Sequence, residues 1–130
     1  MSQANAILGL LTQTSLHAGT GQNTGTIDLP IQREGHNGWP CVFGSAVKGA
    51  LRTVAEERKS GNVSVVYGPG PKGSTSDHAG AIAVGDARLL LLPVRSLTSQ
   101  FRWVTCYDAL LRYSRDRERL GLQGIQGVVP

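Results

Sequence analysis

The chain has 130 residues, of which 40% are hydrophobic, and its thirteen Lys and Arg against nine Asp and Glu give a formal net charge of +4. This length suits one domain with a modest core, and the hydrophobic fraction excludes wholesale disorder. The longest apolar run, residues 89–92, is too short to span a bilayer, and no charged region precedes the first apolar run as a signal peptide would require. The positive charge permits a polyanionic partner but does not demand one.

The first third of the chain predicts a strand followed by a polar hairpin. Residues 6–11 are apolar and favour a strand, although so short a run also allows a helix. Turn-forming residues fill 18–25, Pro30 prevents a helix across 27–33, and residues 35–38 form a second turn. We therefore expect a thumb-like hairpin at about residues 18–40 that projects from the domain.

The middle of the chain predicts a helix over residues 46–59, with Ser45 as its N-cap. Helical spacing places Val47, Ala50, Leu51 and Val54 on its core face. The β-branched stretch 63–67 predicts a strand, and the Gly-, Pro- and Ser-rich stretch 68–80 predicts a flexible loop.

The last third predicts strands over residues 81–84, 88–94 and 101–105, then a helix over 107–120 that ends at Gly121. Helices interleaved with strands indicate an α+β fold of the ferredoxin-like or RNA-recognition type. Such a fold needs four strands in one sheet, and no convincing last strand follows residue 121.

Three stretches carry candidate chemistry, and the first is GSAVKGALR at residues 44–52. A helix N-terminus at Ser45 offers backbone amides to a phosphate, and Lys48 and Arg52 lie one turn apart on one face. Gly49 costs about 1 kcal/mol relative to alanine inside a helix, so close approach of another chain or ligand is one explanation. An ordinary amphipathic helix with two solvated cations is the alternative.

The second stretch is the hairpin, which carries Asp28, Arg33 and, before it, His17. Asp28 is suited to holding a hydrated metal or orienting a hydroxyl, but capping a turn is the commoner role of such an aspartate. Arg33 either contacts a nucleic acid or pairs locally with Glu34 or Asp28. His17 is suited to general-base chemistry, although a packed, hydrogen-bonded histidine is commoner.

The third stretch surrounds Arg95, which directly follows a predicted strand and is placed to reach a ligand. Seven arginines lie between residues 88 and 119, where lysine is absent. The planar guanidinium suits phosphate and base contacts. On the last helix, however, Arg112, Arg115 and Arg119 alternate with acidic residues and favour a solvated face. Cys41 and Cys106 show no zinc-ligand spacing and indicate buried thiols in a reducing compartment.

Four segments together resemble one family: DLPIQREGHNGWP, GSAVKGALR, DARLLLLPVRS and WVTCYDALLRYSRD. They are similar to the RAMP superfamily, and specifically to the backbone subunit of type III-B CRISPR (Cmr) complexes. The resemblance covers residues 16–120. It implies that residues 1–130 form a single RAMP domain with a thumb, whose sheet is completed by a later half that this chain does not include.

The resemblance also implies a function. Copies of a cytoplasmic subunit stack along a guide RNA with other subunits of the complex, and each thumb separates guide from target RNA. Target RNA is then cut at regular intervals with a divalent metal, which we expect to be Mg²⁺. The family's cleavage aspartate matches Asp28, and its RNA-lining helix motif matches Ser45, Lys48 and Arg52; His17 matches a residue of the RNA-facing loop.

Two other functions remain open. The chain is a non-catalytic RNA-binding scaffold if truncation has removed the activity. Alternatively, it is a guide-processing endoribonuclease that uses His17 or His36 as acid and base without a metal. The DLPIQRE match speaks against the guide-processing endoribonuclease.

Overall fold

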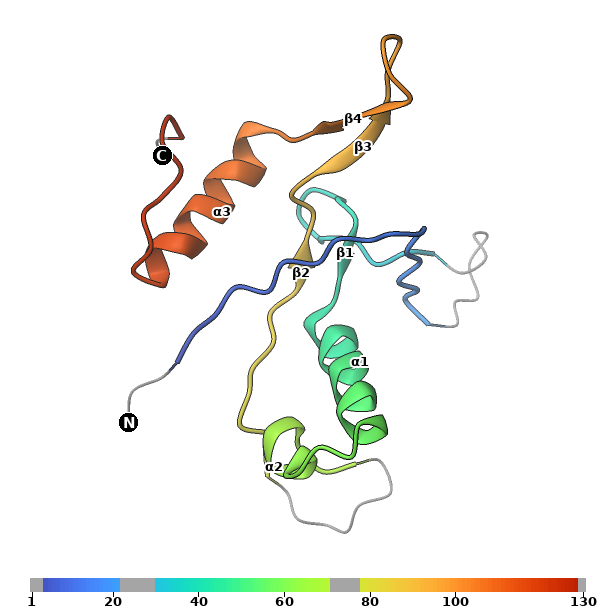
Figure 1. Cartoon of the computed structure of the whole chain (residues 1–130), viewed down its shortest axis with the longest axis vertical. Helices are drawn as coiled ribbons and strands as arrows, with labels where there is room; N and C mark the ends of the chain where they lie inside the picture. Colours follow the sequence, from blue (N-terminus) through green and yellow to red (C-terminus); the bar gives the residue numbers. More distant parts are fainter. Residues whose placement is uncertain (1–3, 22–29, 71–77, 129–130) are drawn as a thin grey trace. The chain divides into compact units, whose positions relative to one another are not determined.

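The computed structural model describes residues 4–21, 30–70 and 78–128. Within them the elements follow one another in the order β1 (Cys41–Val42), α1 (Gly44–Glu57), α2 (Val63–Tyr67), β2 (Ala87–Arg88), β3 (Leu92–Arg95), β4 (Phe101–Val104) and α3 (Tyr107–Arg119), as Figure 1 shows. The expected α+β class is confirmed. The chain divides into two units. The first unit is His17–Arg88, and the second consists of Met1–Leu16 together with Leu89–Pro130.

Antiparallel pairing organises the start of the first unit, His17–Arg88. Isolated bridges join Gly19 to Ile31 and Arg33 to Pro40. Directly after the second bridge, β1 pairs with β2 in an antiparallel two-stranded sheet, with Cys41 opposite Arg88. The chain around residues 18–41 therefore folds back on itself twice before it enters α1.

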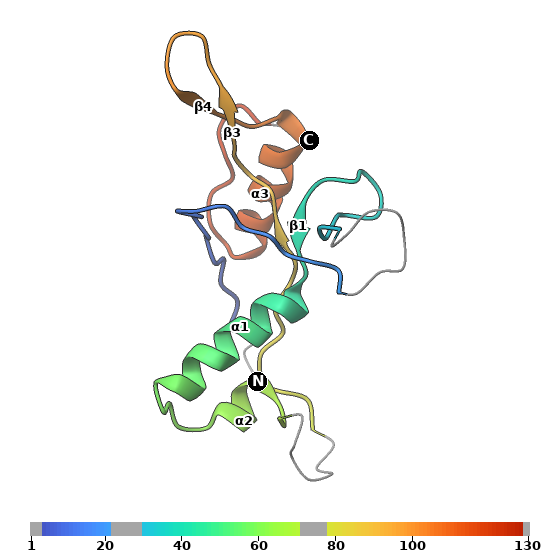
Figure 2. The ribbon, with the colours of Figure 1, turned by 90° about the vertical axis from the view of Figure 1, so that its right-hand side faces the viewer.

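Helix α1 is the longest element of this unit, and the short α2 packs beside it (Figure 2). The helix ends because Lys59 adopts a left-handed conformation, with φ of 50°, and the amide of Ser60 bonds to the carbonyl oxygen of Ala55. The helix predicted over 46–59 is confirmed, with its start and its end each two residues earlier. Among its predicted core residues, Val47 is buried and Leu51 half-buried, whereas Ala50 and Val54 are exposed.

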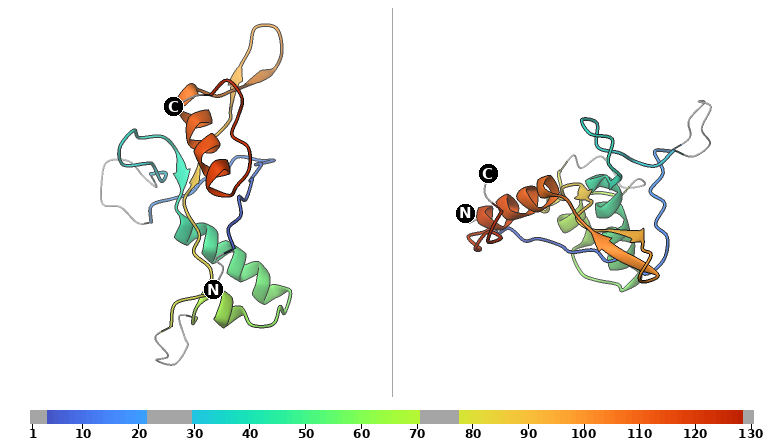
Figure 3. Two further views of the ribbon diagram at one scale, coloured as in Figure 1. Left: turned by 90° about the vertical axis from the view of Figure 1, so that its left-hand side faces the viewer. Right: turned by 90° about the horizontal axis from the view of Figure 1, so that it is seen from above.

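The second unit contains the ribbon β3–β4 and the helix α3. Strand β4 and helix α3 lie where they were predicted, whereas the strand predicted over 88–94 is interrupted, because residue 88 belongs to β2, residues 89–91 form no strand and β3 begins at Leu92. The strands pair antiparallel, with Leu92 opposite Val104 and Arg95 opposite Phe101. Helix α3 carries Asp108 in its first turn and Arg117 and Arg119 in its last, which suits the helix dipole. After Gly121, at φ of 72°, the chain turns back along α3 (Figure 3), where Ser114 Oγ accepts a bond from the Ile125 amide at 2.9 Å.

Three predicted strands are wrong. Residues 6–11 and 81–84 form no regular strand, and residues 63–67 form the helix α2. Asn62 is left-handed, with φ of 62°, and starts this helical turn. The carbonyl oxygens of Val65 and Val66 then accept bonds from the amides of Ala81 and Ile82, at 2.9 and 3.2 Å. These long-range bonds outweigh the β-propensity of the valines. Residues 68–70 and 78–80 form no helix or strand, and the rest of the predicted loop lies outside the described residues.

Few apolar side chains of the described residues are buried. Cys41, Val47 and Ala109 form the buried apolar set, and Gln32, Glu34 and Ser114 are buried polar residues. Cys106, in contrast to the prediction, is exposed. Large apolar side chains are instead exposed along β3, β4 and the first residues of the chain. No helix in the described part of the chain has the length and hydropathy needed to cross a membrane.

Candidate nucleic-acid interface

Gln32 connects the two folded-back segments at the base of the hairpin. Its side-chain amide donates to the Gly19 carbonyl oxygen at 2.8 Å, and its side-chain oxygen accepts from the Phe43 amide at 2.6 Å. Its backbone amide bonds to the Ala18 carbonyl oxygen at 2.8 Å, and its carbonyl accepts from the Cys41 amide at 3.1 Å. One buried glutamine therefore ties the hairpin to the entrance of α1.

A second turn follows at residues 34–39, and the side chain of Arg33 bonds to it. The Glu34 amide donates to the Trp39 carbonyl oxygen at 2.8 Å, and the buried Glu34 carboxylate accepts from the Asn37 side chain at 2.7 Å. The exposed Arg33 side chain donates to the Gly38 carbonyl oxygen at 2.8 Å. This bond to the backbone is neither of the two contacts predicted for Arg33, which were a nucleic acid and a local ion pair with Glu34 or Asp28.

Asp28, the predicted catalytic and metal-binding residue, lies outside the described residues. The chain on either side of this segment is described, and there the Thr20 amide donates to the Pro30 carbonyl oxygen at 3.0 Å. His17 lies exposed at the entrance to this segment. In the part of the chain that is described, no three His, Cys, Asp or Glu side chains gather as a metal site would require.

Ser45 is not the N-cap of α1. Phe43 holds that position, and the helix has no side-chain cap from its own local sequence. Instead the Asp86 carboxylate accepts from the Gly44 amide at 2.7 Å. The interaction places a negative charge at the positive end of the helix dipole. Ser45 lies exposed in the first turn of α1.

Lys48 and Arg52 share one side of α1, as predicted, and both bind the returning chain. Lys48 Nζ donates to the Ile82 carbonyl oxygen at 3.0 Å. Arg52 donates through one terminal nitrogen to the carbonyl oxygens of Gly68 and Pro69, both at 2.9 Å, and through Nε to Glu56 at 2.7 Å. The side chain of Arg52 is 21% exposed. Both cations therefore hold the fold of this unit together.

Arg95 belongs to the other unit, at the end of β3, where it is exposed. The predicted site residues are thus divided among three places: the hairpin with Arg33, helix α1 with Lys48 and Arg52, and the ribbon with Arg95. The structure brings Lys48 and Arg52 together on one helix face.

Three residues that connect the hairpin and the start of α1 to the rest of this unit were not predicted from the sequence: Gln32, Asp86 and Gly44. Gln32 and Glu34 are buried on alternate positions, whereas Arg33 between them is exposed. That alternation is strand-like, but it places polar residues inside, so a hydropathy pattern does not reveal it. Asp86 caps a helix that begins 42 residues earlier, which no local motif can indicate.

Helices and short antiparallel strands define the class as an α+β domain. The chain belongs to the RAMP superfamily, whose family model matches residues 10–129. The predicted family is therefore confirmed.

Similar proteins give a narrower comparison. The CRISPR system Cmr endoribonuclease Cmr4 of Pyrococcus furiosus is 39% identical over 127 residues, which are 95% of this chain and 43% of that protein. The crystal structure of oligomeric Cmr4 from the same organism superposes with a TM-score of 0.72 at 35% identity, covering 92% of this chain and 42% of that one. A type III-B Cmr-beta complex solved in the apo state contains a chain that matches with a TM-score of 0.61 at 25% identity, covering 83% and 40%. The chain thus spans less than half the length of these relatives.

Proposed function

We propose that this chain is a guide-RNA-binding backbone subunit of a type III-B CRISPR effector complex, in which it cleaves target RNA. The observation that carries the proposal is the 39% identity, over 95% of the chain, to a protein named as a Cmr endoribonuclease. In this complex the chain binds guide RNA, target RNA, further copies of itself and the other subunits.

The hairpin supports a role for Asp28 at a projecting thumb. The bond between Thr20 and Pro30 and the bridge between Gly19 and Ile31 hold the two ends of its segment side by side. The contacts of Gln32 then anchor this paired base to the start of α1. A segment held in this way can enter between two nucleic-acid strands without unfolding the domain behind it.

RNA supplies the nucleophile for the proposed reaction. Its 2′-hydroxyl attacks the neighbouring phosphorus when the backbone is splayed so that attack is in line with the leaving 5′-oxygen. The Asp28 carboxylate accepts the hydroxyl proton or orients that group. A divalent cation such as Mg²⁺ would neutralise phosphate charge. Proteins commonly bind this ion through one or two carboxylates together with phosphates and water. The target sequence is selected by base pairing with the guide RNA, so the protein needs to bind only the RNA backbone.

We propose that six residues bind RNA: His17, Arg33, Ser45, Lys48, Arg52 and Arg95. The charged members attract phosphates wherever they remain accessible, and Arg52 and Lys48 are already ordered by the carbonyl oxygens that they bind. A cation that is ordered before binding loses less side-chain entropy on contact with RNA.

The test is cleavage of labelled, guide-complementary RNA by the reconstituted complex in Mg²⁺, with wild type compared with Asp28→Ala. Asp28→Asn serves as the matched control, because it keeps the shape and removes the charge. We expect regular cleavage by wild type, and target binding without cleavage by both variants; EDTA should also stop the reaction. Equal cleavage by all three proteins would refute the role of Asp28. RNA binding without cleavage by wild type would indicate the scaffold function.

A further inference from the structure

The ribbon β3–β4 has two chemically different faces. In an antiparallel pair, residues directly opposite one another point to the same face, and alternate residues along a strand change face. The pairing of Pro93 with Trp103 and of Arg95 with Phe101 therefore creates one face, which we call the aromatic face. Leu92, Val94, Arg102 and Val104 form the other, which we call the aliphatic face.

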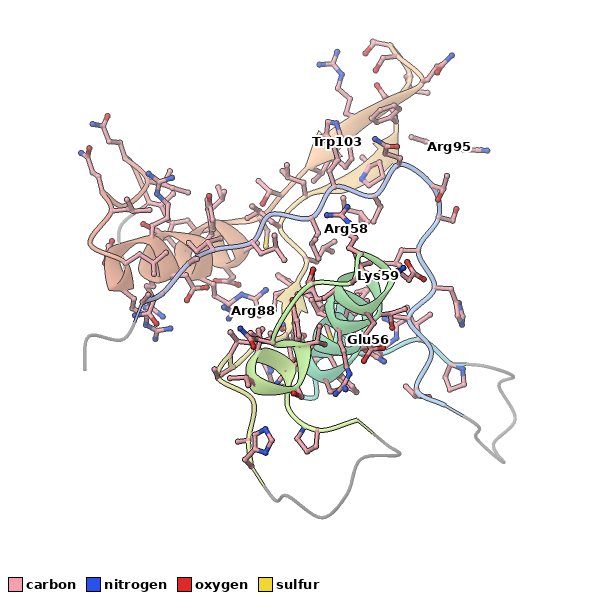
Figure 4. The ribbon with its side chains drawn as sticks, turned by 60° about the horizontal axis from the view of Figure 1, so that its bottom comes forward. Glu56, Arg58, Lys59, Arg88, Arg95 and Trp103 are labelled. Carbon is pink, nitrogen blue, oxygen red and sulfur yellow. The ribbon has the colours of Figure 1, made fainter. Side chains whose placement is uncertain are left out.

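The aromatic face is open in the described structure. Phe101 and Trp103 are each 48% exposed, and their rings meet edge to face, with centroids 5.6 Å apart at 89°. This contact holds both rings in place and leaves ring surface accessible. Figure 4 shows Arg95 and Trp103 on the ribbon, with the Arg95 side chain reaching away from it.

The charge of the ribbon is of one sign. Residues 92–104 contain Arg95 and Arg102 and no Asp or Glu. Arg102, on the aliphatic face, bonds to Thr98 Oγ1 in the connecting turn at 3.3 Å. Arg95, on the aromatic face, lies opposite Phe101. Exposed aromatic rings beside a cation, without acidic residues, complement a ligand that combines flat apolar rings with negative charge.

We propose that the aromatic face is a stacking platform for unpaired bases of single-stranded RNA, with Trp103 and Phe101 stacking on bases and Arg95 binding the adjoining phosphate. Every base has a flat π-face, so aromatic side chains bind single strands with little regard to sequence. This suits a subunit whose sequence choice is delegated to a guide. The platform rests on the proposed RNA-binding function and adds contacts that phosphate binding by α1 and the hairpin does not provide.

The first test uses fluorescence of the full chain in a Trp39→Phe background, where Trp103 is the remaining tryptophan. The probes are a mixed-sequence single-stranded RNA and an RNA of the same length in which the bases are replaced by abasic sites. We expect the intact RNA to quench Trp103, because a stacked base contacts the indole. The abasic RNA keeps the phosphates and should leave the fluorescence unchanged.

The second test measures RNA affinity by anisotropy and does not depend on the Trp39 substitution. Trp103→Leu keeps apolar bulk but removes the stacking ring, and we expect it to bind intact RNA about tenfold more weakly while its affinity for abasic RNA is unchanged. Arg95→Gln should weaken binding of both RNAs. Arg102→Gln is the matched control, since it removes the same charge from the aliphatic face and should have the smaller effect.

The outcomes separate this inference from the proposed function. If the chain binds RNA but Trp103 is not quenched, or Trp103→Leu binds as wild type does, the platform is wrong and RNA binding stands. If the chain binds no RNA, the proposed function fails and the platform with it. A change in Trp103 emission that grows with protein concentration in the absence of RNA would assign this face to contacts between copies of the chain and overturn the platform.

Discussion

Two glycines of α1 should respond in opposite ways to the same substitution. At Gly44, a Cβ would collide with the Val84 carbonyl oxygen and would lie 2.9 Å from the backbone carbon atoms of Val84 and Gly85. At Gly49, a Cβ would meet nothing within 4 Å. Gly44→Ala and Gly49→Ala therefore add the same methyl group to one helix, once against backbone and once into open space.

The expected magnitudes follow from this difference. Replacing glycine by alanine inside a helix gains about 1 kcal/mol, so Gly49→Ala should stabilise the chain by up to that amount. Overpacking costs about 1–3 kcal/mol, and backbone atoms cannot avoid a methyl group by changing rotamer. Because the Gly44 amide also bonds to Asp86 at 2.7 Å, moving the helix to make room weakens that bond. We expect Gly44→Ala to destabilise the chain by about 2 kcal/mol.

Urea unfolding followed by circular dichroism at the helix band measures both effects in parallel. The two variants should differ by about 3 kcal/mol in free energy of unfolding, with similar dependence on urea concentration. If Gly44→Ala is as stable as Gly49→Ala, the close approach of residues 84–85 to α1 does not exist in solution and the reasoning fails.

Other expected outcomes concern the cysteines, Arg52 and Gly49. Burial, with added repulsion from nearby carboxylates, raises the pKa of the Cys41 thiol above its ordinary value of 9.0. In the native chain an alkylating reagent should therefore modify the exposed Cys106 first, and Cys41 only after unfolding or at alkaline pH. Equal rates of modification at neutral pH would contradict the burial of Cys41. Because protonated Cys41 is favoured in the fold, its contribution to stability should be complete below pH 9.0 and decline as the pH rises further. Arg52→Met should cost about 1–2 kcal/mol in urea unfolding because two backbone carbonyls lose their donor, and Arg52→Lys should recover part of it; no loss in either variant would show that these bonds are not formed. Gly49→Ala should weaken RNA binding in spite of its higher stability if RNA approaches this part of α1, and unchanged affinity would exclude that approach.

Long periodic segments were predictable from the sequence, whereas elements that depend on distant bonds were not. Helix α1 followed from its apolar spacing, and Gly121 was identified as the residue that ends α3 because a left-handed conformation suits glycine. The cap of α1 was predicted wrongly. Ser45 fits the local rule, but the Asp86 carboxylate, far along the chain, occupies the role instead.

The error at residues 63–67 has a similar origin. Three valines in five residues favour a strand by propensity. The structure forms a helical turn there, since left-handed Asn62 redirects the chain and the returning residues 81 and 82 bond to its carbonyl oxygens. Gly80 permits this approach, because a Cβ at that position would come within 2.6 Å of the Gly68 amide nitrogen. Propensity describes the segment alone, and these bonds come from outside it.

The candidate site was predictable in its residue types but not in their contacts. Lys48 and Arg52 were expected as cations available to RNA, and the structure shows that both also bind backbone carbonyl oxygens of their own chain. A loss of RNA affinity on replacing either one therefore has two possible causes, a lost phosphate contact or a disturbed fold. Arg33 and Arg95 are exposed, so their substitution disturbs the described fold less. An RNA affinity that falls with Arg95→Gln while the free energy of unfolding stays constant would therefore be stronger evidence for an RNA-binding surface than a larger loss at Arg52.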